Sequence, residues 1–235
     1  MKFDKRLYVV LVLLAARAAW VRADGPQTQP AGGVSDVSRP APKLVPAPND
    51  LLDKVQNELH KMRSIEADFS ELIYPKDHKD PQLFRGHLAA KEPNTVIWRV
   101  ESPVHIIVRV QGEDVRIWDG DKPNEVEKKN LAGNPTYKVM AQQTRDWAGG
   151  NFKVLSESYD VFVEQNEPLT LRFIPKPRTG LAKTFSSVSA TLGPGYGSII
   201  RIVYRKSTGE VYAFTLKDPK VNTPIPDKVW EVPPK

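Results

Sequence analysis

The stretch that decides the fold of this 235-residue chain is residues 93–120, which read PNTVIWRVESPVHIIVRVQGEDVRIWDG. It holds three short runs rich in β-branched residues, separated by Ser-Pro and by a turn that contains glycine, and this pattern predicts an antiparallel meander. Strand side chains alternate between the two faces of a sheet. Val96, Trp98 and Val100 therefore share one face of the first strand. The second strand repeats the pattern with Val104, Ile106, Val108 and Val110. The meander is predicted to have one continuously apolar face.

Outward from the meander, the hydrophobic period predicts mostly strands. Upstream, a helix is expected over 50–63, with Asn49 or Asp50 as its N-cap, followed by strands from residue 65 and over 83–90. Downstream, an edge strand is expected over 124–129 and a second helix over 135–147, which Gly149-Gly150 ends. The remaining strands are predicted at 152–156, 159–164, 169–175, 184–192, 198–205, 210–217 and 229–232. About ten or eleven short strands and two helices favour an α+β, mainly β fold: a large, strongly curved antiparallel sheet with helices on one side.

The N-terminus is predicted to be a secretory signal peptide over 1–23, because a basic segment precedes an apolar run and small residues that suit cleavage. Residues 24–48 hold six prolines and almost no large apolar side chain, so we expect a disordered tether there and a folded domain over 49–235. Five of the 34 basic residues and one of the 28 acidic residues lie in the signal peptide, so its removal lowers the net charge from +6 to +2. This small charge gives no reason to expect a nucleic-acid partner.

The sequence does not predict an enzyme or a metal site. It contains no cysteine, no Gly-x-Ser-x-Gly elbow and no His-Glu-x-x-His motif. Gly193-x-Gly195-x-Gly197 precedes a strand rather than a helix, so it is interpreted as a turn and not as a phosphate loop. We therefore expect no cofactor, and the absence of cysteine in an exported chain fits a periplasmic location.

The large apolar side chains on the predicted strands allow two interpretations. They fill a closed core, or they line a ligand-sized apolar cavity, since a curved sheet with only two helices over it can enclose one. The candidate lining residues from the strands are Phe69, Leu88, Val96, Trp98, Val100, Ile106, Val108 and Trp118.

Several short motifs follow one another along the chain. Ile65-Glu66-Ala67-Asp68-Phe69-Ser70-Glu71 is followed by Gly86-His87-Leu88, Lys91-Glu92-Pro93-Asn94, Ser102-Pro103, Ile117-Trp118-Asp119 and Val229-Trp230-Glu231-Val232-Pro233-Pro234. In this order, and over about 51–234, the series resembles the periplasmic outer-membrane lipoprotein carriers of the LolA family and LolA-like proteins. The first motif is similar to the family's Phe-x-Gln strand.

The resemblance implies an unclosed antiparallel β-barrel whose concave apolar face is lidded by helices and receives acyl chains of lipoproteins. It places Val96 and Trp98 on the lined face and Met140 and Trp147 on the lid helix. The family's arginine at the lid and release position is replaced by Glu92, which reverses the charge, and the neighbouring Lys91 is the alternative donor there.

From this resemblance we expect a monomeric carrier that takes acyl chains of lipoproteins, or another lipid, from an inner-membrane donor complex to an outer-membrane acceptor. The alternative is a sensor or scaffold of the same fold, comparable to lipoprotein-binding regulators of envelope stress. Such a protein would bind lipid without transporting it.

Overall fold

The computed structural model describes residues 44–76, 80–130 and 151–233. The strands are β1 (Val45–Pro46), β2 (Ser64–Tyr74), β3 (Gln82–Lys91), β4 (Thr95–Ser102), β5 (Ile106–Gln111), β6 (Asp114–Asp119), β7 (Val126–Asn130), β8 (Tyr159–Asn166), β9 (Leu169–Pro175), β10 (Phe185–Leu192), β11 (Ile199–Lys206) and β12 (Val211–Val221). The α-helices are α1 (Asn49–Leu59) and α3 (Phe152–Ser158). Short 3-10 turns are η2 (Pro177–Thr179), η3 (Leu181–Lys183), η4 (Pro194–Tyr196) and η5 (Asp227–Trp230).

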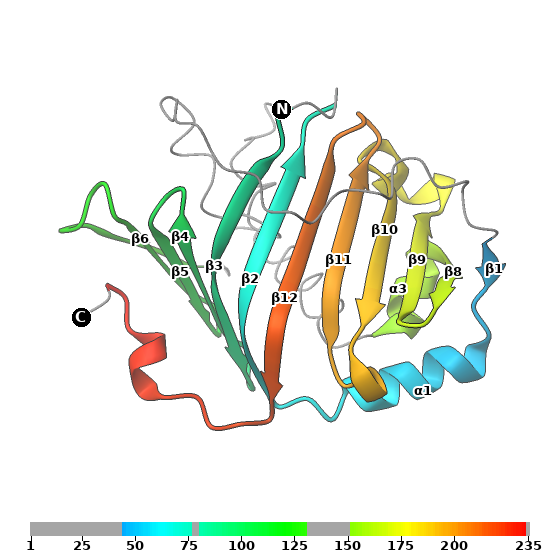
Figure 1. Cartoon of the computed structure of the whole chain (residues 1–235), viewed down its shortest axis with the longest axis horizontal. Coiled ribbons are helices and arrows are strands. Elements are labelled where there is room, and N and C mark those ends of the chain that lie inside the picture. The colour runs from blue at the N-terminus through cyan, green and yellow to red at the C-terminus, as the bar shows by residue number, and fades with distance from the viewer. Residues whose placement is uncertain (1–43, 77–79, 131–150, 234–235) are drawn as a thin grey trace.

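All described strands belong to one 12-stranded sheet in the order β1-β8-β9-β10-β11-β12-β2-β3-β4-β5-β6-β7. Every neighbouring pair is antiparallel, and β1 and β7 end the sheet without pairing with each other. Figure 1 shows the sheet strongly curved, with α3 behind it and α1 along the lower ends of the strands at one side. The predicted curved, unclosed antiparallel sheet is confirmed, with slightly more strands than expected.

Two predicted strands are helical in the structure. Residues 152–156 form part of α3, because Phe152, Leu155 and Tyr159 are all buried and follow one another at helical spacing. A five-residue run is too short to reveal that period from the sequence. Residues 229–232 overlap η5, whose backbone carbonyls accept hydrogen bonds from arginine side chains rather than from a neighbouring strand.

The N-terminal part of the domain also differs from the prediction in its boundaries. Helix α1 ends at Leu59 rather than at residue 63, because the chain turns at 60–63 to enter β2. Strand β1 pairs with the edge of β8 through Val45 and Pro46, so the sheet extends upstream of the expected domain start at Asn49. The predicted helix over 135–147, the signal peptide and most of the tether lie outside the described residues.

Two apolar clusters lie on the inner face of the sheet, toward α3. The first, which we call the helix-covered cluster, joins Val55 and Leu59 of α1 and Phe152 and Leu155 of α3 to β8–β10. The second, the meander cluster, is formed by strands alone. Its buried members are Phe69, Phe84, Val100, Ile106, Val108 and Val115, and its partly buried members are Ile73, Leu88, Trp98, Val104, Val110, Ile117, Phe214 and Leu216.

The C-terminal segment covers the outer face of the meander. Trp230 is buried against Ala89, Ile97 and Ile107, which point away from the meander cluster. The Arg99 guanidinium donates hydrogen bonds to the carbonyl oxygens of Val229 and Glu231 at 2.7 and 2.8 Å. Arg109 donates one to the Trp230 carbonyl oxygen at 2.8 Å. These bonds anchor a segment that has no strand partner of its own.

Gly86 allows β3 and β4 to approach each other closely. A Cβ atom at this position would collide with the Arg99 carbonyl group and would lie 3.0 Å from the Phe69 ring. The register between β3 and β4 shifts at this point, between Arg85 and Gly86. A side chain here would therefore push apart the two strands that carry the centre of the meander cluster.

We predict that Gly86→Ala lowers the free energy of unfolding by about 3 kcal/mol, because the added methyl group has no space. Urea unfolding followed by circular dichroism measures the change. The matched control is Gly197→Ala, where the nearest atom to the added Cβ lies 3.9 Å away and φ is −73°. Equal midpoints for the two variants would contradict the close packing at Gly86.

Candidate functional site

The register aligns apolar side chains across the strands of the meander. Leu88 on β3 pairs with Trp98 on β4, and Trp98 pairs with Val108 on β5. Val108 in turn pairs with Ile117 on β6. Directly paired residues point to the same face of a sheet, so these four side chains form one continuous row. This row of the inner face is therefore apolar from β3 to β6, as the sequence predicted.

Much of this inner face is only half-buried. Leu88, Trp98 and Val110 are partly exposed, although they point to the inner side, and so are Phe214 and Leu216 on β12. Neither α1 nor α3 contributes a residue to the meander cluster, since both belong to the helix-covered cluster. Helix α1 covers the inner face at β8–β10, on the other half of the sheet, and not at the meander. Within the described residues, the meander cluster is an apolar surface without a helix over it.

The structure brings most of the predicted lining residues together. Phe69, Val100, Ile106 and Val108 are buried members of the meander cluster, and Leu88 and Trp98 pack against them. Val96 pairs with Val110 and so points to the same face, but it lies near the start of β4, outside the cluster. Met140 and Trp147 lie outside the described residues.

Trp118 is a correction to the predicted lining. On β6, Val115 and Ile117 point into the meander cluster, so Trp118 points to the outer face. There it packs in the cluster around Trp230, and its indole N–H donates a hydrogen bond to the Pro123 carbonyl oxygen at 3.0 Å. The prediction selected Trp118 for its size and ignored the alternation along its strand.

The two residues at the predicted lid and release position also point away from the meander cluster. The Lys91 ammonium lies 4.6 Å from the centroid of the Trp230 ring, on the outer face. Glu92 pairs with the Arg63 guanidinium at 2.6 Å, and both side chains are largely exposed. The ion pair between Glu92 and Arg63 therefore links the turn after β3 to the turn before β2. An exposed pair of this kind contributes little to stability.

A fully buried acidic side chain, Glu71, lies on the inner face, and the sequence analysis did not select it. Glu71 follows Phe69 at the two-residue spacing of β2, and its side chain has no exposed surface. It pairs with Phe84 on β3 and with Phe214 on β12. Neither carboxyl oxygen has a hydrogen-bond partner among the described residues. The sequence could have predicted this inward position, because Glu71 lies two residues from Phe69 and two from Ile73 and therefore on the same face of the strand.

Burial without a partner changes the ionisation of this carboxyl. Desolvation raises the pKa of Glu71 well above its ordinary value of 4.5, because the apolar surroundings disfavour the charged form. Burial likewise raises the pKa of Tyr204 on β11, with smaller contributions from Tyr159 and from Glu71. The inner face thus favours an uncharged carboxylic acid.

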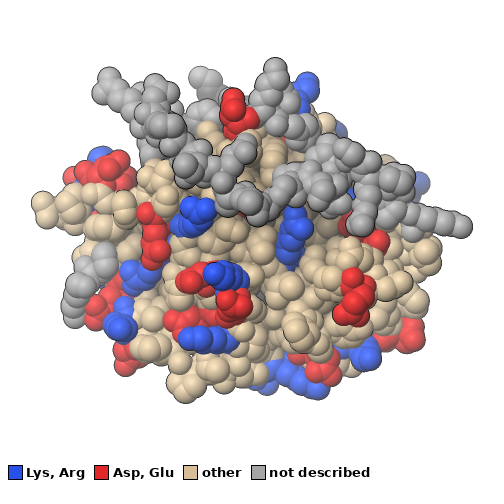
Figure 2. Space-filling model, in the orientation of Figure 1, with Lys and Arg blue, Asp and Glu red and all other residues tan. Residues whose placement is uncertain are grey.

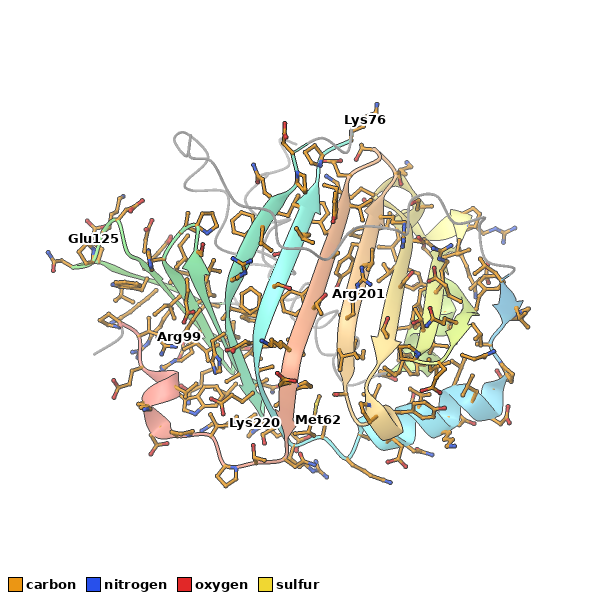
Figure 3. The ribbon with its side chains drawn as sticks, viewed as in Figure 1. Met62, Lys76, Arg99, Glu125, Arg201 and Lys220 are labelled. Carbon is orange, nitrogen blue, oxygen red and sulfur yellow. The ribbon has the colours of Figure 1, made fainter. Side chains whose placement is uncertain are left out.

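The outer face of the sheet has a different character. Figure 3 shows Arg201 in front of β11 and Arg99 beside the C-terminal segment, and Figure 2 shows acidic and basic side chains spread over this same face. His87 lies between Glu66 and Asp68 there, with ring nitrogens 3.1 and 3.0 Å from their carboxylate oxygens. The described residues hold no group of three or more side chains placed to bind a metal ion. They also contain no helix of the length and apolarity needed to cross a bilayer.

The family model for "Outer membrane lipoprotein carrier protein LolA" matches residues 60–232, which include every strand from β2 to β12. The chain belongs to the LolA family. An outer-membrane lipoprotein carrier protein of Pseudomonas putida KT2440 is 25% identical over 175 residues, covering 74% of this chain and 79% of that protein. One from Yersinia pestis strain Angola is 26% identical over 189 residues, covering 79% and 86%. The crystal structure of a LolA superfamily protein from Nitrosomonas europaea aligns with a TM-score of 0.41 at 16% identity, covering 80% of this chain and 98% of that one.

We predict that the stability of this LolA family member depends on pH through Glu71. The folded-state pKa is raised, so the stabilisation by the protonated form is complete below pH 4.5 and is lost as the pH rises through the folded pKa. Over that interval, the free energy of unfolding of the wild type should fall by about 1.4 kcal/mol per pH unit relative to Glu71→Met. Urea titrations of both proteins between about pH 4 and 8 measure the difference. Parallel pH profiles would contradict the account of a buried neutral carboxyl.

Proposed function

We propose that this protein is a non-enzymatic periplasmic carrier that binds acyl chains of lipoproteins, or of another lipid, on the meander cluster and ferries them toward the outer membrane. The observation that carries the proposal is the half-buried apolar row on the inner face, in a chain of the LolA family. Removing apolar surface from water contributes about 0.8 kcal/mol per buried methylene group, so a chain of eight carbons or so already supplies useful affinity.

The arrangement of the two faces supports this role. An acyl chain needs an extended apolar surface, and the row from Leu88 through Trp98 and Val108 to Ile117 crosses four strands at about 4.8 Å per strand. Over the described residues, the outer face carries charged side chains, and the C-terminal segment covers its meander strands. A bound chain would therefore lie on the inner side, shielded by the curvature of the sheet. We propose that the protein works as a monomer between an inner-membrane donor and an outer-membrane acceptor.

Two tryptophans on opposite faces of the meander give a matched test. Trp98→Ala removes a large contact from the proposed binding surface, and we predict that it weakens binding of cis-parinaric acid about tenfold, as the loss of an aromatic contact does in other apolar sites. Trp118→Ala removes a tryptophan that is also half-buried but points to the outer face, and should leave the affinity within about twofold. Fluorescence titration measures both affinities.

Melting temperatures of the two variants control for loss of the fold. Equal weakening of binding in the two variants would contradict the assignment of the inner face. Binding without any transfer of labelled acyl lipid between vesicles would contradict the carrier role and favour a protein that only binds or senses lipid.

A further inference from the structure

Among the described residues, none forms a hydrogen bond with the Glu71 carboxyl that would explain its place in the sheet. Glu71 sits at the centre of the apolar face, with Phe69 and Ile73 on either side along its own strand and Phe84 and Phe214 beside it on the neighbouring strands. Both carboxyl oxygens are buried, and in the part of the chain that the structure describes neither has a hydrogen-bond partner. A buried polar group without a hydrogen bond destabilises the folded state, so an ordinary core position would hold an apolar side chain here.

We propose that the Glu71 carboxyl is a ligand contact: it donates a hydrogen bond to the ester or amide carbonyl oxygen of a bound acyl group. The inference rests on the proposed function, because it takes the inner face of the meander as the acyl-binding surface. It adds the chemical class of ligand that this surface selects, which is an acyl chain with a carbonyl oxygen at its link to the headgroup. Such a chain should bind in preference to a plain hydrocarbon or an ether-linked chain.

The surroundings favour a neutral carbonyl over a cationic ligand. The residues that flank the carboxyl on its own strand and its directly paired residues are apolar, and Tyr204 on β11, whose pKa Glu71 helps to raise, is uncharged. A cation bound there would therefore lose its hydration with only one carboxylate in return. A neutral carbonyl group loses far less on transfer to the same site. A protonated carboxyl has one O–H group to donate, and a carbonyl oxygen is the acceptor that an acyl chain always brings.

A ligand reaches Glu71 by displacing the apolar side chains packed around it. Phe214 and Ile73 flank the carboxyl and are only half-buried, so each has solvent on one side. Phe214 stacks on Phe69 with ring centroids 5.1 Å apart. Movement of Phe214 toward solvent would open the carboxyl to the inner face without breaking a hydrogen bond of the sheet.

The test compares two ligands that differ only in the carbonyl groups: dioctanoylglycerol and its dioctyl ether. The wild-type protein should bind the ester about tenfold more tightly, which corresponds to about 1.4 kcal/mol. Glu71→Met should abolish the preference, because methionine keeps the volume and offers no donor. Glu71→Gln should keep it, because the amide N–H group can donate to the same oxygen. Competition against cis-parinaric acid measures all affinities.

The outcomes separate this inference from the proposed function. If ester and ether bind equally well to the wild type, or if Glu71→Met keeps the preference, the carbonyl contact is wrong while the acyl-binding face stands. If neither ligand binds, both proposals fail. Tighter binding of octylammonium than of the ester, lost in Glu71→Met, would replace the carbonyl contact by a cation site.

A second measurement needs no variant, in case Glu71→Met does not fold. Infrared spectra of a ¹³C-carbonyl-labelled ester should show the carbonyl band at lower frequency in the complex than in hydrocarbon solvent, because a hydrogen bond weakens the C=O stretch. A band at the frequency found in hydrocarbon solvent would overturn the proposal.

Discussion

The rest of the structure depends on how one antiparallel sheet buries its inner face. The strands pair in one curved sheet that does not close, so every apolar side chain of the proper parity ends on the same side. One half of that side is packed by α1 and α3 around Phe173 and Leu171. The other half carries the meander cluster, to which the same helices add nothing. An apolar surface that the described helices leave uncovered is the physical basis of the proposed lipid binding.

The two faces of the meander are stabilised by different interactions. On the outer face, Trp230 fills the space over Ile97 and Ile107, and Arg99 and Arg109 hold its backbone by hydrogen bonds. The sheet is therefore anchored from outside as well as by the buried members of the meander cluster. This division lets apolar residues on the inner face remain available to a ligand.

Local periodicity accounts for what the sequence could predict. The alternation around Trp98 gave its face correctly, and the two-residue period fixed most strands, because both depend on neighbours in the chain. Contacts between distant residues could not be predicted in this way. Trp230 packs against residues more than 120 positions away, so its helical turn was mistaken for a strand. The outer-face position of Trp118 could have been predicted from the sequence, because Trp118 directly follows Ile117 and adjacent strand residues point to opposite faces.

Glu71 is an acidic residue at an inward-facing position of an alternating strand. The alternation of β2 predicts that the Glu71 side chain points to the inner face, whereas an acidic residue is usually exposed. In the structure the side chain is buried on the inner face, as the alternation predicts. A buried carboxyl without a partner lowers stability by about 1–3 kcal/mol in mutational comparisons. The protein tolerates this cost within one of its apolar clusters, beside side chains that are only half-buried. A hydrogen bond to a bound acyl group would offset it.

The most direct test of the central claim is to map where an acyl chain lies on the protein. A fatty acid with a diazirine at the end of its chain can be photo-crosslinked to the protein, and the adducts can be located by peptide mass spectrometry. The account predicts adducts on β3, β4 and β12 at inner-face residues such as Leu88, Trp98 and Phe214, which an excess of unlabelled fatty acid removes. Adducts confined to the outer face around Trp118 and Trp230, or adducts that unlabelled fatty acid does not reduce, would contradict it.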